Sequence, residues 1–220
     1  MRAISLISDT LPSLKMTDTD SRALRWMNEL HVDQLPVINN HKFLGLVSEL
    51  DILDRNTPDE PVINHELQRQ GLFVKDNDHL FEVLKISSEK KLTVIPVLDK
   101  QENYLGSITL NQLLDFFTKE TDIIETGGII VLEVEVRNYS VTEIARIIET
   151  NGGSILGLFA GSNADPNLRD VTIKINRADL NPIIAAFERF NYHIKDTYQE
   201  EEYFHDVRDR FDSLMNYLNV

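Results

Sequence analysis

The chain has 220 residues, no cysteine and a net charge of −14, which arises from 36 acidic and 22 basic side chains. A surface this negative repels phosphate backbones and anionic lipid headgroups, so nucleic acids and membranes are not expected as partners. The absence of cysteine excludes disulfides and thiolate metal sites and fits a cytoplasmic protein.

The first half of the chain contains an internal repeat. QLPVINNHKFLGLVSELDIL at 34–53 matches VIPVLDKQENYLGSITLNQLL at 94–114, with one extra residue in the turn of the second copy. A segment with helical spacing of apolar residues precedes each copy, so each unit predicts a helix, two strands joined by a polar turn, and a second helix. We expect Thr17 or Asp18 to cap the first helix of copy one, and Asp76 or Asp78 that of copy two.

Each copy passes from its second strand into its second helix through a hydroxyl residue followed three positions later by a polar one. These pairs are Ser48 with Asp51, and Thr109 with Gln112. A helix N-terminus favours an anion, and a carboxylate at Asp51 can accept hydrogen bonds from a ribose diol. The alternative is that Ser48 merely caps the helix while Asp51 complements its dipole. Because Gln112 has no charge, we expect the second site to be weaker or empty.

Other residues of the repeats are candidates for the walls of these two sites. Cations at His31, Arg55 and Lys91 could reach a phosphate, although most surface cations are only solvated. Four apolar residues are candidates to pack an adenine ring, but packing in the protein core is the stronger expectation for Leu35, Pro36, Ile95 and Pro96.

The second half of the chain has a different pattern. Strands are predicted at 129–138, 154–162, 169–177 and 193–199, with helices at 140–153 and 178–192. This βαββαβ order is that of a split ferredoxin-like sandwich. Ser140 is the expected cap of the first of these helices, and Asp179 or Asn181 of the second. Residues 200–220 predict an amphipathic terminal helix.

The doubled unit, with LPVI and IPVL followed by FLGLVS and YLGSIT, resembles a cystathionine-β-synthase-type (CBS) domain pair, or Bateman module. The βαββαβ part resembles an ACT domain in length and order, although the Pro-Gly turn common after the first ACT strand is absent. The combination resembles the acetoin-utilisation type of CBS–ACT protein. The expected fold is therefore α+β, with CBS domains at 1–57 and 63–120, an ACT-like domain at 128–199 and the helix at 200–220.

The resemblance implies a regulatory protein without enzymatic activity that binds an adenine nucleotide (AMP, ADP or ATP) or S-adenosylmethionine. Ser48 would face the phosphate and Asp51 the ribose, and the protein would form a homodimer. No catalytic motif, metal site or required cofactor is expected. One alternative is a CBS scaffold that dimerises without a ligand. Another is an amino-acid-type effector bound by the ACT-like part, for which the candidates are Asn138, Asn151 and Gly153.

Overall fold

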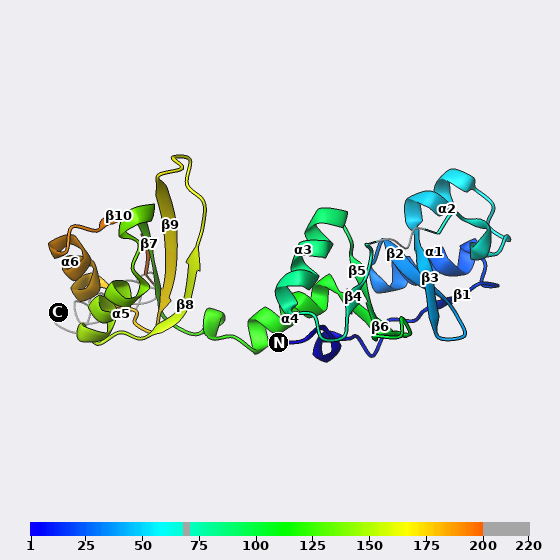
Figure 1. The fold of residues 1–220 in the computed structure, drawn as a ribbon, viewed down its shortest axis with the longest axis horizontal. Helices are drawn as coiled ribbons and strands as arrows, with labels where there is room; N and C mark the ends of the chain where they lie inside the picture. Colours follow the sequence, from blue (N-terminus) through cyan, green and yellow to red (C-terminus); the bar gives the residue numbers. More distant parts are fainter. Residues whose placement is uncertain (68–70, 200–220) are drawn as a thin grey trace, which may run out of the picture. The chain divides into compact units, whose positions relative to one another are not determined.

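The computed structural model describes residues 1–67 and 71–199 and divides the chain into two compact units, Met1–Phe117 and Thr118–Val220 (Figure 1). Both units combine helices with small sheets, so the α+β prediction is confirmed. The terminal helix predicted at 200–220 lies outside the described residues. No helix of the described part is long and apolar enough to span a bilayer.

The first unit contains two three-stranded sheets with the same topology. In each, a short strand pairs in parallel with the middle strand, which pairs antiparallel with the third. The first repeat consists of β1 (Leu14–Lys15), α1 (Asp20–Leu30), β2 (Gln34–Asn39), β3 (Lys42–Ser48) and α2 (Glu49–Arg55). The second consists of β4 (Val74–Lys75), α3 (Leu80–Lys90), β5 (Val94–Leu98), β6 (Tyr104–Thr109) and α4 (Leu110–Lys119). The predicted order of elements is confirmed in both copies.

The first helix of each repeat begins later than expected. Thr19 caps α1 and His79 caps α3, so the caps predicted at 17 or 18 and at 76 or 78 are wrong. The carboxylates of Asp18 and Asp78 instead accept the backbone N–H of the residue three positions earlier, at 2.7 Å in both repeats. Each aspartate therefore closes the turn between strand and helix, which is a common alternative use of this side chain.

A 3₁₀ turn at the start of the chain, η1 (Ala3–Leu6), packs on the second repeat rather than on the first. Ala3 N donates to Asp78 O at 2.8 Å, and Ser8 N donates to Ser107 O at 2.8 Å. Ala3 is 0% exposed and belongs to the core built around β5. The N-terminal segment thus completes the repeat that lies further along the chain.

The segment that links the two repeats in sequence packs in the opposite direction, on the first repeat. The 3₁₀ turn η2 (Val62–Asn64) packs on the first repeat, where Val62 N donates to Asp18 O at 2.8 Å. Val62 is 0% exposed within the core built around β2. The two cores also share strands, since Val94 of β5 lies in the first core and Phe43 of β3 lies in the second.

Hydrogen bonds join the two repeats where their middle strands begin. Asp33 N donates to Thr93 Oγ1 at 2.9 Å, and Thr93 N donates to Gln34 Oε1 at 3.0 Å. At the hairpin turns, Tyr104 N donates to His41 O at 2.8 Å. With the exchanged segments, these bonds make the CBS-like repeats one packed body.

The second unit is a four-stranded antiparallel sheet in the order β10-β7-β9-β8. Its elements are β7 (Gly128–Glu135), α5 (Val141–Thr150), β8 (Ile155–Ala160), β9 (Leu168–Ile175), α6 (Asn181–Arg189) and β10 (His193–Tyr198), with 3₁₀ turns η3 (Asp122–Ile124) and η4 (Val136–Asn138). Alternate residues of β7 are buried beneath the two helices. The predicted ferredoxin-like order is confirmed.

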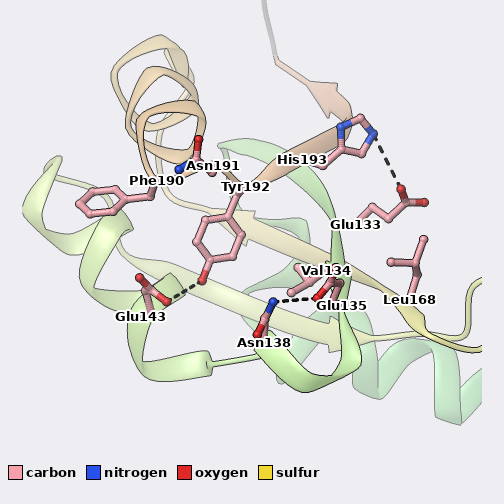
Figure 2. A pocket seen from close by; sticks show the side chains of 10 residues that line it. All are labelled: Glu133, Val134, Glu135, Asn138, Glu143, Leu168, Phe190, Asn191, Tyr192 and His193. Atoms are coloured by element: carbon pink, nitrogen blue, oxygen red, sulfur yellow. Dashed lines mark hydrogen bonds and ion pairs between the residues drawn. The ribbon is translucent and has the colours of Figure 1, made fainter.

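The helices of this unit are anchored at their N-termini in different ways. Ser140 caps α5 as expected, accepting the N–H of Glu143 at 3.3 Å. The cap of α6 is Leu180, and Asp179 only accepts the N–H of Asn181 at 3.0 Å, so the expected polar cap is wrong. Tyr192, just before β10, donates its hydroxyl hydrogen to Glu143 Oε2 at 3.1 Å and ties this loop to α5 (Figure 2).

Candidate functional site

The junction of β3 and α2 is a complete capping box. Ser48 Oγ accepts the N–H of Asp51 at 3.1 Å, while Asp51 Oδ2 accepts Ser48 N at 3.3 Å and Ser48 Oγ at 2.6 Å. Such a box satisfies two orphan donors of a helix N-terminus reciprocally. The structural role foreseen as the alternative for Ser48 and Asp51 is therefore present.

The equivalent junction of β6 and α4 keeps this geometry without the charge. Gln112 N donates to Thr109 Oγ1 at 3.3 Å, and Thr109 N donates to Gln112 Oε1 at 3.4 Å. A glutamine oxygen accepts a hydrogen bond as a carboxylate does, although less strongly. The change from aspartate to glutamine thus preserves the helix start and removes a negative charge from the junction.

In both helices, the first backbone N–H group also donates a hydrogen bond to a carbonyl of the protein. Glu49 N donates to Asp33 O at 2.9 Å, and Leu110 N donates to Thr93 O at 3.3 Å. The first and third N–H groups of each helix are therefore engaged, one by a carbonyl and one by the capping box. An anion at either helix N-terminus would have to compete with these bonds.

A cavity of about 330 Å³ lies beside Thr109 and Gln112. It is lined by residues of the exchanged N-terminal segment, the end of α1 and the start of α4: Ser8, Asp9, Thr10, Leu11, Leu30, Thr109, Asn111, Gln112 and Asp115. Its volume lies at the lower end of the range for small-molecule sites, about 300–1,000 Å³. The described residues therefore form a cavity at the second predicted site.

The N-terminal wall of this cavity is held in place by Gly106. Gly106 has φ +154°, and a Cβ at this position would collide with the side chain of Ile7. The absence of a side chain lets residue 7 lie directly on β6, so that the next residues reach the cavity. Ser8 N then bonds to the carbonyl of Ser107.

The surroundings of Asp51 are only partly described. In the sequence repeat, residues 68–71 correspond to residues 8–11, and residues 68–70 lie outside the described part. The expectation that the Asp51 site is the stronger one therefore stays a prediction.

The remaining candidates of the first unit do not gather around the cavity. His31 and Lys91 are exposed residues in the left-handed conformation that end α1 and α3. Arg55 pairs with Glu60 of the segment between the repeats. Four apolar candidates are buried in the strands, in agreement with the expected core role: Leu35, Pro36, Ile95 and Pro96.

The three effector candidates of the second unit do not share a site. Asn138 donates to Glu135 Oε2 at 2.8 Å and lines a separate cavity. Asn151 donates to the carbonyl of Ile147 at 2.7 Å at the end of α5. Gly153 is buried, and a Cβ there would meet Ile148 and Ile183. The last two have local structural roles, whereas Asn138 lines a cavity.

Most residues that line the cavity are not among the site residues predicted from the sequence. Residues 8–11 and Leu30 had no motif to mark them, because they approach Gln112 only through the exchange of the N-terminal segment. Asn111 and Asp115 lie on the same helix as Gln112, and the helical spacing of Asp115 was a usable signal. Among the described residues, no cluster of three or more His, Asp or Glu side chains is arranged to hold a metal ion.

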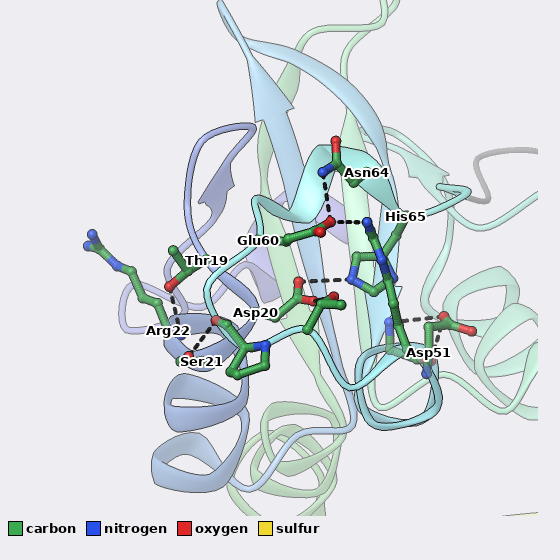
Figure 3. Close-up of polar contacts among 12 residues, drawn as sticks. Thr19, Asp20, Ser21, Arg22, Asp51, Glu60, Asn64 and His65 are labelled. Carbon is green, nitrogen blue, oxygen red and sulfur yellow. Dashed lines mark hydrogen bonds and ion pairs between the residues drawn. The ribbon is translucent and has the colours of Figure 1, made fainter.

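A buried polar pair fixes the segment between the two repeats (Figure 3). His65 Nε2 lies 2.8 Å from Asp20 Oδ1, and their side chains are 5% and 0% exposed. Thr57 Oγ1 donates to the other oxygen of Asp20 at 3.3 Å. Asn64 and Arg55 both bond to Glu60 on the same segment. Residues 57–65 are thereby fixed to the start of α1.

The family model of the CBS domain matches residues 4–56 and 62–119, about half of the chain. The chain therefore belongs to the CBS domain family. It is 25% identical over 129 residues to a CBS domain-containing protein of Dictyostelium discoideum, covering 52% of this chain and 89% of that one. It is also 23% identical over 119 residues to a homoserine O-acetyltransferase of Methanosphaera stadtmanae, covering 54% of this chain. The match spans only 24% of that enzyme's length.

Solved structures with similarity to the chain include a CBS domain pair/ACT domain protein of Thermotoga maritima. The TM-score is 0.49 at 21% identity, and the match covers 55% of this chain and 98% of that one. The AcuB protein of Vibrio cholerae gives a TM-score of 0.47 at 20% identity, with coverage of 55% and 97%. Family membership rests on the CBS model, which matches the two repeats of the first unit.

His65→Ala should destabilise the protein by about 3–5 kcal/mol, because it leaves the buried Asp20 carboxylate without its main partner. Urea unfolding followed by the fluorescence of Trp26, the single tryptophan, on α1, measures this change. Asn64→Ala is the matched control, since it removes an exposed hydrogen bond and should cost less than about 1 kcal/mol. Equal effects of the two substitutions would contradict a structural role for the buried pair.

Proposed function

We propose that the CBS pair is a regulatory sensor that binds an adenine-containing small molecule in the cavity beside Thr109 and Gln112. The observation that supports this most is the cavity itself, which combines polar side chains at a strand-to-helix junction with apolar walls from Leu11 and Leu30. Polar groups of this kind orient a ligand, whereas the apolar surface supplies binding energy. CBS pairs are generally regulatory modules, and we propose that this chain acts in the cytoplasm without catalysing a reaction.

The charge of the cavity favours S-adenosylmethionine over AMP, ADP or ATP. Its described lining contains the carboxylate of Asp9 and no Lys or Arg. A phosphate there would face negative charge without a cation in that lining, whereas the sulfonium of S-adenosylmethionine gains from it. Gln112 Oε1 and Thr109 Oγ1 each accept one backbone N–H, and each has a second lone pair with which to accept a hydrogen bond from a ribose hydroxyl.

The position of the cavity suggests how a signal could leave it. Its walls come from α1, the N-terminal segment and α4, and α4 is the helix through which the chain passes from the first unit toward the second. A ligand that contacts all three favours the conformation in which they lie together. Its binding shifts the population toward that conformation and so changes the start of the link between the units.

Calorimetry with S-adenosylmethionine, AMP, ADP and ATP tests the proposal on the full chain. We expect S-adenosylmethionine to bind most tightly and Gln112→Ala to weaken it about fivefold, the cost of one hydrogen bond of about 1 kcal/mol. Gln101→Ala, an exposed glutamine in the β5–β6 turn, is the control and should change nothing.

The same calorimetric measurements distinguish binding at the β6–α4 junction from binding at the β3–α2 junction. If Asp51→Ala abolishes binding while Gln112→Ala does not, the ligand occupies the other repeat, as the sequence first indicated, and our assignment of the cavity is wrong. If no ligand of the panel binds, the sensor proposal fails and a CBS pair that only dimerises is the better description.

We further propose that the protein is a homodimer that pairs through α2 and α4. Exposed leucines lie on both helices: Leu50 and Leu53 are 72% and 55% exposed, and Leu114 is 64% exposed. Leu53 and Leu114 occupy equivalent positions of the repeat. The two helices therefore present a pseudo-symmetric apolar face, which in this proposal contacts the second copy of the chain.

Sedimentation analysis should give twice the chain mass of 25.3 kDa for the wild type. Leu53→Asp combined with Leu114→Asp should give the monomer mass. Phe81→Asp, at an equally exposed apolar residue of α3, should leave the dimer intact. A monomeric wild type, or a dimer that survives the double substitution, would refute this interface.

A further inference from the structure

We propose that the sheet of the second unit has an apolar docking surface, and that residues 200–220 of the same chain cover it. One face of this sheet carries α5 and α6, whose buried side chains pack on alternate residues of β7. The opposite face, here called the open face, is covered by no α-helix among the described residues of this unit. The inference concerns the second unit alone and does not rest on the ligand proposed for the CBS pair.

The inner strand β7 is apolar on both sides where it begins. The side chains of Ile130 and Leu132 are fully buried beneath the helices. Ile129 and Val131 alternate with them, so they lie on the open face, where both are only partly buried. A strand with one solvated face alternates apolar and polar residues, whereas a strand covered on both faces is continuously apolar. The start of β7 therefore has the sequence of a strand that is covered on both faces.

The strand registers extend this apolar surface across the sheet. Tyr198 of β10 pairs with Ile129. Phe159 of β8 pairs with Thr172 of β9, which itself pairs with Val131. Directly paired residues point to the same side of a sheet, so these side chains share the open face. Tyr198 is 58% exposed and Phe159 is 50% exposed. Large apolar side chains from β7, β8 and β10 thus lie on one surface, which is called the apolar surface below: Ile129, Val131, Phe159 and Tyr198.

Charged residues at these register positions leave the apolar surface accessible. Lys174 pairs with Ile129, and its ammonium group donates to the carbonyl of Gly127 at 3.0 Å. The charge of Lys174 is thus bonded within the unit, while its methylene groups add to the apolar surface. Asp196 pairs with Val131, but it is an exposed residue of the edge strand β10.

The charged part of the open face lies further along β7. Glu133 pairs with Asp170 of β9 and with His193 of β10. Lys195 Nζ donates to Asp170 Oδ2 at 2.6 Å. The apolar surface is therefore confined to the end of the sheet where β7 begins and β10 ends, and it forms a patch rather than scattered single side chains.

In this proposal the occupant is the part of the chain that follows β10. Residues 200–220 lie outside the described residues, and their sequence has apolar side chains at the spacing of one helical face: Phe204, Val207, Phe211, Leu214 and Leu218. A helix of this length is marginal in water unless its apolar side packs on another surface. Since α5 and α6 already fill the other face of the sheet, the open face is the one left for it in this unit.

The position and length of this segment match the apolar surface. β10 ends at Tyr198, whose side chain belongs to that surface, so the segment begins beside it. A helix from Phe204 to Leu218 is about 21 Å long. With strands about 4.8 Å apart, β10 and β8 are about 14 Å from each other, so such a helix spans the sheet. The short connection gives the segment a high effective concentration, which favours it over the same segment of a second copy.

Thiol labelling of the full chain, which has no cysteine of its own, tests this proposal. Thr172→Cys introduces one thiol in the middle of the open face with little change in size. Glu149→Cys introduces a control thiol at an exposed position of α5. We expect a bulky maleimide to react at position 172 at least tenfold more slowly than at position 149, because residues 200–220 cover the open face.

Phe211→Asp in the Thr172→Cys chain should accelerate labelling at least fivefold, because it puts a charge on the apolar side of the segment. Asn216→Asp puts the same charge on the opposite side of the predicted helix and should leave the rate unchanged. Ala186→Cys introduces a thiol at a buried position of α6, and its labelling should stay slow in the Phe211→Asp chain, which shows that the unit remains folded.

Three results would overturn the proposal. The first is an unchanged rate at position 172 in the Phe211→Asp chain, and the second is equal acceleration by Phe211→Asp and Asn216→Asp or at positions 172 and 186. The third is protection at position 172 that is lost on dilution of the chain without the aspartate substitutions, which would make a second copy the occupant.

Discussion

Each repeat of the first unit completes its core with a short segment that precedes the other repeat in sequence. Ala3 inserts into the second core and Val62 into the first, and both are fully buried. Burial of a valine side chain contributes about 1.5–3 kcal/mol, a large fraction of the stability of an ordinary domain. Neither repeat is therefore complete without the other, and the cavity beside Gln112 exists only because the N-terminal segment crosses to the second repeat.

The electrostatics of the two cavities follow one pattern. The chain has a net charge of −14, and the described residues line both cavities with carboxylates and without Lys or Arg. A negative, partly desolvated pocket favours ligands that are neutral or cationic at their point of contact.

The sequence was most informative where structure depends on local periodicity. The repeat and the βαββαβ pattern predicted the elements of both units, because apolar spacing and turn residues act over short distances. The capping residues of α1 and α3 differ from the predicted ones, because Asp18 and Asp78 accept hydrogen bonds from the backbone of the preceding strand instead of from the helix. Asparagine and aspartate side chains have several local partners available, and their choice depends on the detailed turn geometry.

The site was harder to predict because it depends on contacts between distant parts of the chain. The capping role of Ser48 and its counterpart Thr109 followed from spacing alone. The contribution of residues 8–11 required the segment exchange, which leaves no repeat or motif in the sequence. Likewise Gly153 and Asn151 resemble loop residues of a binding site, but packing and a helix-end hydrogen bond explain them.

A double-mutant cycle between Ile7 and Gly106 tests the segment exchange most directly. Free energies of unfolding are measured for wild type, Ile7→Ala, Gly106→Ala and the double variant, and the coupling free energy is calculated. A methyl group at position 106 collides with Ile7. Ile7→Ala should therefore cost less, or even stabilise, when it is combined with Gly106→Ala, with a coupling of about 0.5–3 kcal/mol. Simple additivity of the two substitutions would show that the N-terminal segment does not lie on the second repeat, and would contradict the account.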